Sequence, residues 1–318
     1  MRTLVVGAGA LGGYFGGRLL AAHRDVTFLV RPARAAELDH SGLQIRSSFG
    51  DVNIPAPPIV LAKDLSSTFD LVLLSCKAYD LENALDSFAP AVGPATVIIP
   101  VLNGMRHLDI LDSRFGSGHT LAGYCFIAAN LNERHEIVHL NDRHTLSFGE
   151  RDGTLSDRVK TIETFLRVAS FDVKASTTGI LDMWEKWVFL ATLAGSTCLM
   201  RASVGEIVSS PGGREFMVSL LAECRAIATA AGYPPTEVVI DAVRNLLTAE
   251  ASTLTASMLR DIEKQGPVEA DHVIGDLLIR GEYFGLPPNT LPLLANVYTN
   301  LKAYEARRQR VLNLITGK

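Results

Sequence analysis

The sequence has few cysteines, and none of them forms a metal or redox motif. Its 318 residues include four cysteines, and no two of them stand as Cys-x-x-Cys. In a chain of this length, scattered cysteines indicate reduced thiols in a cytoplasmic protein and argue against a disulfide framework.

The chain also lacks a positive net charge and an apolar run long enough to span a membrane. The net charge is −4, so no overall basic field would hold nucleic acid or an anionic membrane surface. Residues 187–200 are uncharged, but these fourteen residues fall short of the roughly 20 that a membrane-spanning helix needs. We therefore expect a globular protein with neither a nucleic-acid nor a membrane partner.

The length and the hydrophobic pattern predict two domains, because a single core rarely grows beyond roughly 250–300 residues. The first half alternates helix-compatible stretches with short apolar runs that predict strands buried on both faces, at Leu4–Val6, Val26–Val30, Leu71–Ser75 and Thr96–Leu102. The second half is helical, with stretches at Arg214–Ala231, Thr236–Ala249, Thr255–Lys264, Val268–Phe284 and 291–315. We expect a Rossmann-type, doubly wound parallel sheet over residues 1–176 and an all-helical domain over residues 177–318.

Two segments interrupt this pattern. Leu43–Arg46 and Val52–Ile54 predict a hairpin, and residues 121–148 are β-rich. The second segment contains His135-Glu136-Ile137-Val138-His139, a His-Glu-x-x-His string that binds zinc when it lies on a helix. In a strand the two histidines would lie about 13 Å apart, so we expect no metal site here.

A glycine loop follows the first predicted strand and opens a helix. It has the form Gly-x-Gly-x-x-Gly and comprises Gly7, Ala8, Gly9, Ala10, Leu11 and Gly12. Its glycines allow a tight turn, the approach of a pyrophosphate and close packing of helix on strand, and the helix N-terminus attracts the phosphate. The loop therefore predicts dinucleotide binding; the alternative is a glycine-rich packing turn.

The end of the second strand indicates which dinucleotide is bound. A site for NAD(H) normally carries Asp or Glu there to hold the ribose 2′-hydroxyl. This strand ends in Arg31, with Arg34 close by. A guanidinium group suits a 2′-phosphate, so we expect NADP(H) rather than NAD(H).

Other polar residues stand where a ligand could reach them, each with an ordinary structural alternative. Lys77 and Asn103 follow the third and fourth predicted strands, at the edge where ligands bind in such sheets. Lys186 lies in the first turn or so of an apolar helix that Asp182 and Glu185 would cap, either snorkelling to solvent or facing a cleft as a proton donor.

In this order along the chain, the motifs resemble those of the ketopantoate reductase family, which are NADPH-dependent 2-dehydropantoate 2-reductases. They are GAGALGG from Gly7, CKAYD around Lys77, LNGM around Asn103, SFGE before residue 151, WEKW around Lys186 and ASMLRDIEKQGPVEADHVIG over 256–275. The resemblance implies a Rossmann domain plus a helical domain, an active site in the cleft and a role in pantothenate biosynthesis.

The resemblance also implies a role for individual residues. Lys186 matches the catalytic lysine that protonates the ketone oxygen. Glu269 matches the carboxylate that anchors the substrate hydroxyl and supports the lysine, and in this sequence it is expected in the first turn of a helix. Ser257 matches a substrate hydrogen-bond donor, and Asn103 matches an asparagine that touches both nicotinamide and substrate. Arg31 and Lys77 match cofactor-binding positions.

One departure from the family concerns the substrate. The family typically places asparagines four and eight residues after the catalytic lysine, where this chain has Leu190 and Ala194. Positions four and eight residues apart share a helix face, so the change removes two amides from the strip expected to face the substrate. The substrate is therefore open between 2-dehydropantoate, a related 2-keto acid and a bulkier, more apolar carbonyl compound.

The expected function is that of an NADPH-dependent reductase with a small carbonyl substrate. The alternatives are a regulatory protein that senses NADPH without turnover and a reductase of another carbonyl or an imine. The long C-terminal helix and the apolar second half would either bury a homodimer interface or complete the core.

Overall fold

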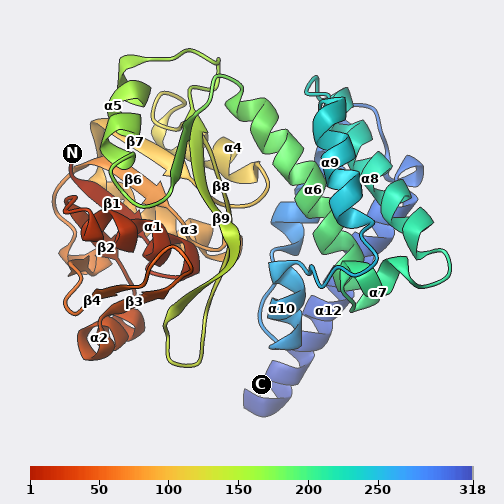
Figure 1. The fold of residues 1–318 in the computed structure, drawn as a ribbon, viewed down its shortest axis with the longest axis horizontal. Coiled ribbons are helices and arrows are strands. Elements are labelled where there is room, and N and C mark those ends of the chain that lie inside the picture. The colour runs from red at the N-terminus through yellow and green to blue at the C-terminus, as the bar shows by residue number, and fades with distance from the viewer. Residues whose placement is uncertain (317–318) are drawn as a thin grey trace. The chain divides into compact units, whose positions relative to one another are not determined.

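Two groups of elements make up the structure, a computed structural model that describes residues 1–316. The first unit comprises Met1–Leu102 and His107–Gly179, and the second comprises Asn103–Arg106 and the chain from Ile180 onward. In Figure 1 the first unit is coloured from red to yellow-green, and the part of the second unit from Ile180 onward is coloured from green to blue.

A parallel sheet of five strands lies at the centre of the first unit. In spatial order its strands are β5 (Ile59–Val60), β2 (Val26–Leu29), β1 (Thr3–Val6), β6 (Phe69–Leu74) and β7 (Val92–Pro100), and all neighbours run parallel. Alternate residues of β1 enter different cores, since Val5 lies in one apolar cluster and Leu4 and Val6 in another. The sheet is therefore buried on both faces, as the continuous apolar runs predict.

Helices cover both faces of this sheet. Phe15 and Leu19 of α1 belong to the cluster that contains Val5, whereas Leu85 of α3 and Leu111 of α4 belong to the other cluster. The helices of this unit are α1 (Ala10–Ala21), α2 (Pro32–Ser41), α3 (Leu81–Phe88), α4 (Arg106–Phe115) and α5 (Asp157–Leu166), with single 3₁₀ turns at Ala62–Asp64, Ala78–Asp80 and Ala89–Ala91. Together with the helical second unit, this arrangement confirms the expected fold class.

A second sheet packs against α1. It contains β3 (Leu43–Arg46), β4 (Val52–Ile54), β8 (Ala122–Leu131), β9 (Ile137–Gly149) and β10 (Asp172–Ala175). Strands β3 and β4 form the predicted hairpin, with Leu43 opposite Ile54. The hairpin joins the β-rich segment because β3 also pairs with β9.

In the second unit, every regular element that the structure describes is a helix or a helical turn. They are α6 (Gly179–Met200), α7 (Val204–Val208), α8 (Gly213–Ala230), α9 (Glu237–Leu247), α10 (Ser257–Glu263), a π-helical turn at Asp271–Gly275, α11 (Asp276–Tyr283), a 3₁₀ turn at Pro288–Thr290 and α12 (Pro292–Thr316). Within residues 1–316, none of the helices combines the length and apolar character needed to cross a membrane.

The start of α6 differs from the sequence expectation. The helix begins at Gly179, after a turn in which the Ser176 hydroxyl accepts the Thr178 N–H at 3.1 Å. Glu185, which would pair with Asp182 in a cap, instead accepts the backbone N–H and the hydroxyl of Thr236, at 3.0 and 3.1 Å. Lys186 consequently lies about two turns into the helix rather than in its first turn.

Candidate functional site

The glycine loop connects β1 to α1 and depends on two of its glycines for its shape. Gly7 has a φ of +94°, a conformation that residues with a Cβ rarely adopt. A Cβ at Gly12 would lie 2.1 Å from the Gly7 carbonyl oxygen and 2.2 Å from the Ser75 hydroxyl. The loop therefore folds back tightly on β1 and on the residue after β6.

Gly9, in contrast, leaves room beside the loop. Apart from Gly9 itself and its two neighbours in the chain, no atom of the described residues lies within 4 Å of the position that a Cβ would take at Gly9. Gly9 is the N-cap of α1 and has no side chain to cap the first N–H groups of the helix. Because free N–H groups at a helix N-terminus attract anions, the loop fits the pyrophosphate of a dinucleotide.

Arg34, a residue of α2, is hydrogen-bonded to this loop. Its Nε donates a hydrogen bond to the Ala8 carbonyl oxygen at 3.0 Å, and its Nη1 lies 2.9 Å from the Glu37 carboxylate. Both guanidinium contacts are therefore internal to the protein. Arg34 therefore supports the loop through the Ala8 carbonyl, while Arg31 is the more exposed arginine of the two.

Arg31 and Lys77 both lie at the carboxyl edge of the parallel sheet, as expected. Arg31 is the N-cap of α2, and its Nη2 lies 2.7 Å from the Asp80 Oδ1. The hydrogen bond and charge of Asp80 raise the pKa of Arg31. Lys77 directly precedes the 3₁₀ turn Ala78–Asp80 and is half-buried. Asp80 has no sequence signal of its own beyond being a carboxylate soon after a strand end.

In the second unit, one face of α6 carries the predicted catalytic residue Lys186 together with Leu190 and Ala194. Lys186, Leu190, Ala194 and Thr197 follow one another at spacings of four, four and three residues, so they form one stripe along the helix. Lys186 and Leu190 are half-buried, while Ala194 is buried at 4% exposure. The stripe therefore has a cationic end at Lys186, an apolar middle and a hydroxyl group at Thr197.

A buried hydrogen bond ties this helix to the segment that contains Glu269. The Trp187 indole N–H donates to the Val273 carbonyl oxygen at 2.8 Å, and the Val273 N–H donates to the Glu269 carbonyl oxygen at 2.9 Å. Glu269 lies just before the helical residues rather than in a first turn, and the residue is buried, at 8% exposure. The π-helical turn that follows, Asp271–Gly275, is an irregularity often found at functional sites.

The turn that contains Asn103 packs against the same π-helical turn, although it lies far earlier in the sequence. Gly104 has a φ of +74°, and a Cβ there would lie 2.6 Å from the His272 carbonyl oxygen. The Asn103-Gly104 turn therefore packs directly on the π-helical turn. His272 is buried, and its burial together with Arg106 and Arg280 lowers its pKa to about 4, so the imidazole is neutral at pH 7.

Ser257 lies at the far end of the α6 stripe. It is the first residue of α10, and the preceding Ala256 N–H donates to the Thr197 hydroxyl at 3.4 Å. Ser257 itself is exposed. In the second unit, the Asn103-Gly104 turn thus packs on the π-helical turn that follows Glu269, and Trp187, the residue after Lys186, is hydrogen-bonded to the same turn; Ser257 lies toward the other end of the stripe.

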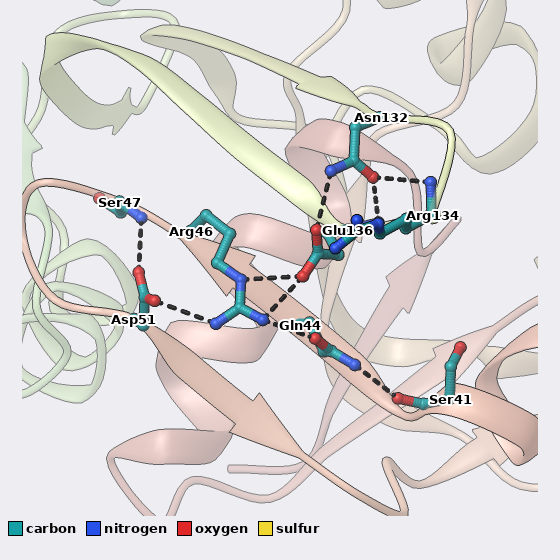
Figure 2. A network of polar contacts seen from close by, with 8 residues as sticks. All are labelled: Ser41, Gln44, Arg46, Ser47, Asp51, Asn132, Arg134 and Glu136. Carbon is teal, nitrogen blue, oxygen red and sulfur yellow. Dashed lines mark hydrogen bonds and ion pairs between the residues drawn. The ribbon is translucent and has the colours of Figure 1, made fainter.

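The His-Glu-x-x-His string belongs to a polar network of the second sheet. Figure 2 shows Arg46 of β3 bound to Glu136, to Asp51 and to Gln44, with Asn132 holding Glu136 from the β8–β9 turn. His135 lies 3.2 Å from a Glu37 carboxylate oxygen. The other histidine, His139, instead contacts the Ser47 hydroxyl at 2.9 Å. Nowhere in residues 1–316 do three or more His, Cys, Asp or Glu side chains form a group that could hold a metal ion.

Comparisons with known proteins cover both units. Residues 3–153 match the family described as "Ketopantoate reductase PanE/ApbA", and residues 180–305 match "Ketopantoate reductase PanE/ApbA C terminal". A Bacillus subtilis protein named "Uncharacterized oxidoreductase YkpB" is 35% identical over 97% of this chain and 100% of its own length.

Two further relatives carry a more specific name. A 2-dehydropantoate 2-reductase from Archaeoglobus fulgidus is 26% identical over 90% of this chain and 92% of its own length. The crystal structure of 2-dehydropantoate 2-reductase from Geobacter metallireducens superimposes with a TM-score of 0.86 at 26% identity, covering 95% of this chain and 99% of the other.

Proposed function

Because the chain belongs to the ketopantoate reductase family, a family of oxidoreductases, we propose that it is an NADPH-dependent reductase of a 2-keto acid with Lys186 as the general acid. The observation that carries this proposal is the α6 stripe. A half-buried lysine stands two turns into an apolar helix, next to the Trp187–Val273 hydrogen bond that holds the Glu269 segment in place.

The first unit would hold the cofactor. The room beside Gly9 and the free N-terminus of α1 fit a pyrophosphate, and Arg31 offers a guanidinium group to a ribose 2′-phosphate. Lys77 would add a second positive charge at the same sheet edge. When bound, the reduced nicotinamide supplies the hydride; the protein contributes binding, orientation and electrostatics.

The second unit would bind the substrate and provide the proton. The Lys186 ammonium group would donate a hydrogen bond to the ketone oxygen and give it a proton as negative charge develops there. The Glu269 carboxylate would accept a hydrogen bond from a substrate hydroxyl and hold Lys186 in place. Ser257 would bind the carboxylate end of the substrate, and Asn103 would orient the substrate from the turn on the π-helical segment.

Leu190 and Ala194 bear on which 2-keto acid is used. Both replace amides of the family pattern along the stripe that starts at Lys186. A strip without those amides makes fewer hydrogen bonds to a polar substrate chain and fits an apolar one better. We propose a 2-keto acid with an apolar side chain as the better substrate and 2-dehydropantoate as the second candidate.

The test is NADPH oxidation against a panel of 2-keto acids that includes 2-dehydropantoate and apolar-substituted members, with cofactor binding measured separately by fluorescence titration. Turnover of at least one 2-keto acid supports the proposal. Tight NADPH binding without turnover of any carbonyl compound would favour the regulatory protein that senses NADPH. Turnover of imines alone would leave Lys186 as the proton donor and change the substrate class.

A further inference from the structure

The guanidinium group proposed to recognise the cofactor is already paired with a carboxylate. Arg31 Nη2 and Asp80 Oδ1 are 2.7 Å apart, with side chains 66% and 29% exposed. Arg31 follows β2 and Asp80 follows β6, and these two strands flank β1 in the sheet. The ion pair therefore lies at the carboxyl edge beside the point where β1 enters the glycine loop.

This pairing affects the two nicotinamide cofactors in opposite ways. A 2′-phosphate carries up to two negative charges, and a carboxylate bound to the same guanidinium group would repel it. A free 2′-hydroxyl is a hydrogen-bond donor, and a carboxylate at the sheet edge is the group that usually accepts it. Asp80 thus weakens the binding of one ligand and offers an acceptor to the other.

Resting on the function proposed above, we propose that Asp80 is a cofactor-specificity residue. Its carboxylate reduces the preference for NADPH over NADH that Arg31 would otherwise give, so that the chain binds both cofactors. The like-charge effect at this edge corresponds to an affinity change of about two- to fivefold. Because Arg31 is exposed and Asp80 is partly exposed, salt screens the interaction, and the effect of Asp80 on affinity decreases at high salt.

The closing experiment measures binding and does not depend on turnover. Dissociation constants for NADPH and NADH are determined by fluorescence titration, and those for adenosine 2′,5′-bisphosphate and AMP by calorimetry, for the wild-type chain and for Asp80→Asn. We expect Asp80→Asn to bind NADPH and the bisphosphate about two- to fivefold more tightly, with NADH and AMP unchanged or weaker. Asp80→Glu retains the charge and is expected to keep the wild-type ratio.

A matched control is Asp86→Asn, because Asp86 forms a similar surface ion pair with Arg114 at 2.9 Å on the other end of α3. This control is expected to leave all four constants unchanged. Equal shifts for both cofactors, or no shift, in a folded Asp80→Asn protein would overturn the specificity role. Failure of the wild-type chain to bind either cofactor would instead overturn the proposed function, and the specificity role with it.

Discussion

The indole N–H of Trp187 donates to the Val273 carbonyl oxygen over 2.8 Å, and both groups are buried. The bond joins the residue after Lys186 to the π-helical turn that follows Glu269. One hydrogen bond therefore fixes the two proposed substrate-binding segments of the second unit against each other.

Replacing Trp187 by Phe leaves the Val273 carbonyl without this donor. A buried carbonyl that loses its donor costs about 1–3 kcal/mol, so we expect a loss of that size in the free energy of unfolding, measured by denaturant titration with far-UV circular dichroism. We also expect a higher KM for the keto acid and unchanged NADPH binding. Trp184→Phe is the control. The Trp184 ring packs on Trp187 and Tyr233, so this substitution also shortens a buried indole but leaves the Trp187–Val273 hydrogen bond in place.

Replacing Lys186 by Met keeps most of the side-chain volume and removes the proton donor. We expect kcat to fall by about 10²–10⁴-fold, the usual contribution of general acid catalysis, while the dissociation constant of NADPH stays the same. Lys264→Met, at an exposed lysine after α10, is expected to leave both unchanged. Wild-type kcat in a folded Lys186→Met protein would remove Lys186 from the mechanism.

The sequence predicts the parallel sheet well because its signal is local. The run at Leu4–Val6 is apolar on every residue and the run at Val26–Val30 on every residue except Thr27, and strands buried on both faces favour such continuous apolar runs. The π-helical turn at Asp271–Gly275 has no such signal, because the same residues satisfy ordinary helical periodicity.

Hydrogen bonds and ion pairs between residues far apart in the chain likewise cannot be predicted from the sequence pattern. Glu185 has the spacing from Asp182 of a local cap, yet it accepts hydrogen bonds from Thr236, far along the chain. Arg31 and Asp80 meet only because β2 and β6 flank β1, an order that the sequence alone does not fix. Tertiary contacts of this kind decide the partners of a charged group, whereas local patterns decide only where the group stands on its element.

The glycine loop allows folding and binding to be separated by two single substitutions. Gly12→Ala would place a methyl group 2.1 Å from the Gly7 carbonyl oxygen, so we expect a destabilisation of at least about 1–3 kcal/mol. Gly9→Ala meets no described atom within 4 Å and is expected to change stability by less than about 0.5 kcal/mol.

Gly9→Ala is nevertheless expected to weaken NADPH binding at least about tenfold, because its methyl group would occupy the space a pyrophosphate needs. Thermal unfolding and cofactor titration measure the two effects separately. Wild-type affinity in the Gly9→Ala protein would show that no phosphate lies against this loop.

His272 makes the stability of the second unit depend on pH. Burial together with Arg106 and Arg280 lowers its pKa to about 4, from an ordinary value of 6.5. Below pH 6.5 the unfolded chain therefore binds a proton that the folded unit does not, and the free energy of unfolding falls as the pH drops. From the two pKa values, the loss reaches about 3 kcal/mol near pH 4.

This loss can be assigned to the second unit, because the only two tryptophans of the chain, Trp184 and Trp187, both lie there. Denaturant unfolding followed by tryptophan fluorescence between pH 7 and pH 4.5 measures it. We expect His272→Gln to reduce the slope of stability against pH, and His40→Gln, at an exposed histidine of the first unit, to leave it unchanged. A slope that is the same in the wild-type and His272→Gln proteins would mean that His272 takes up its proton in the folded unit as readily as in the unfolded chain.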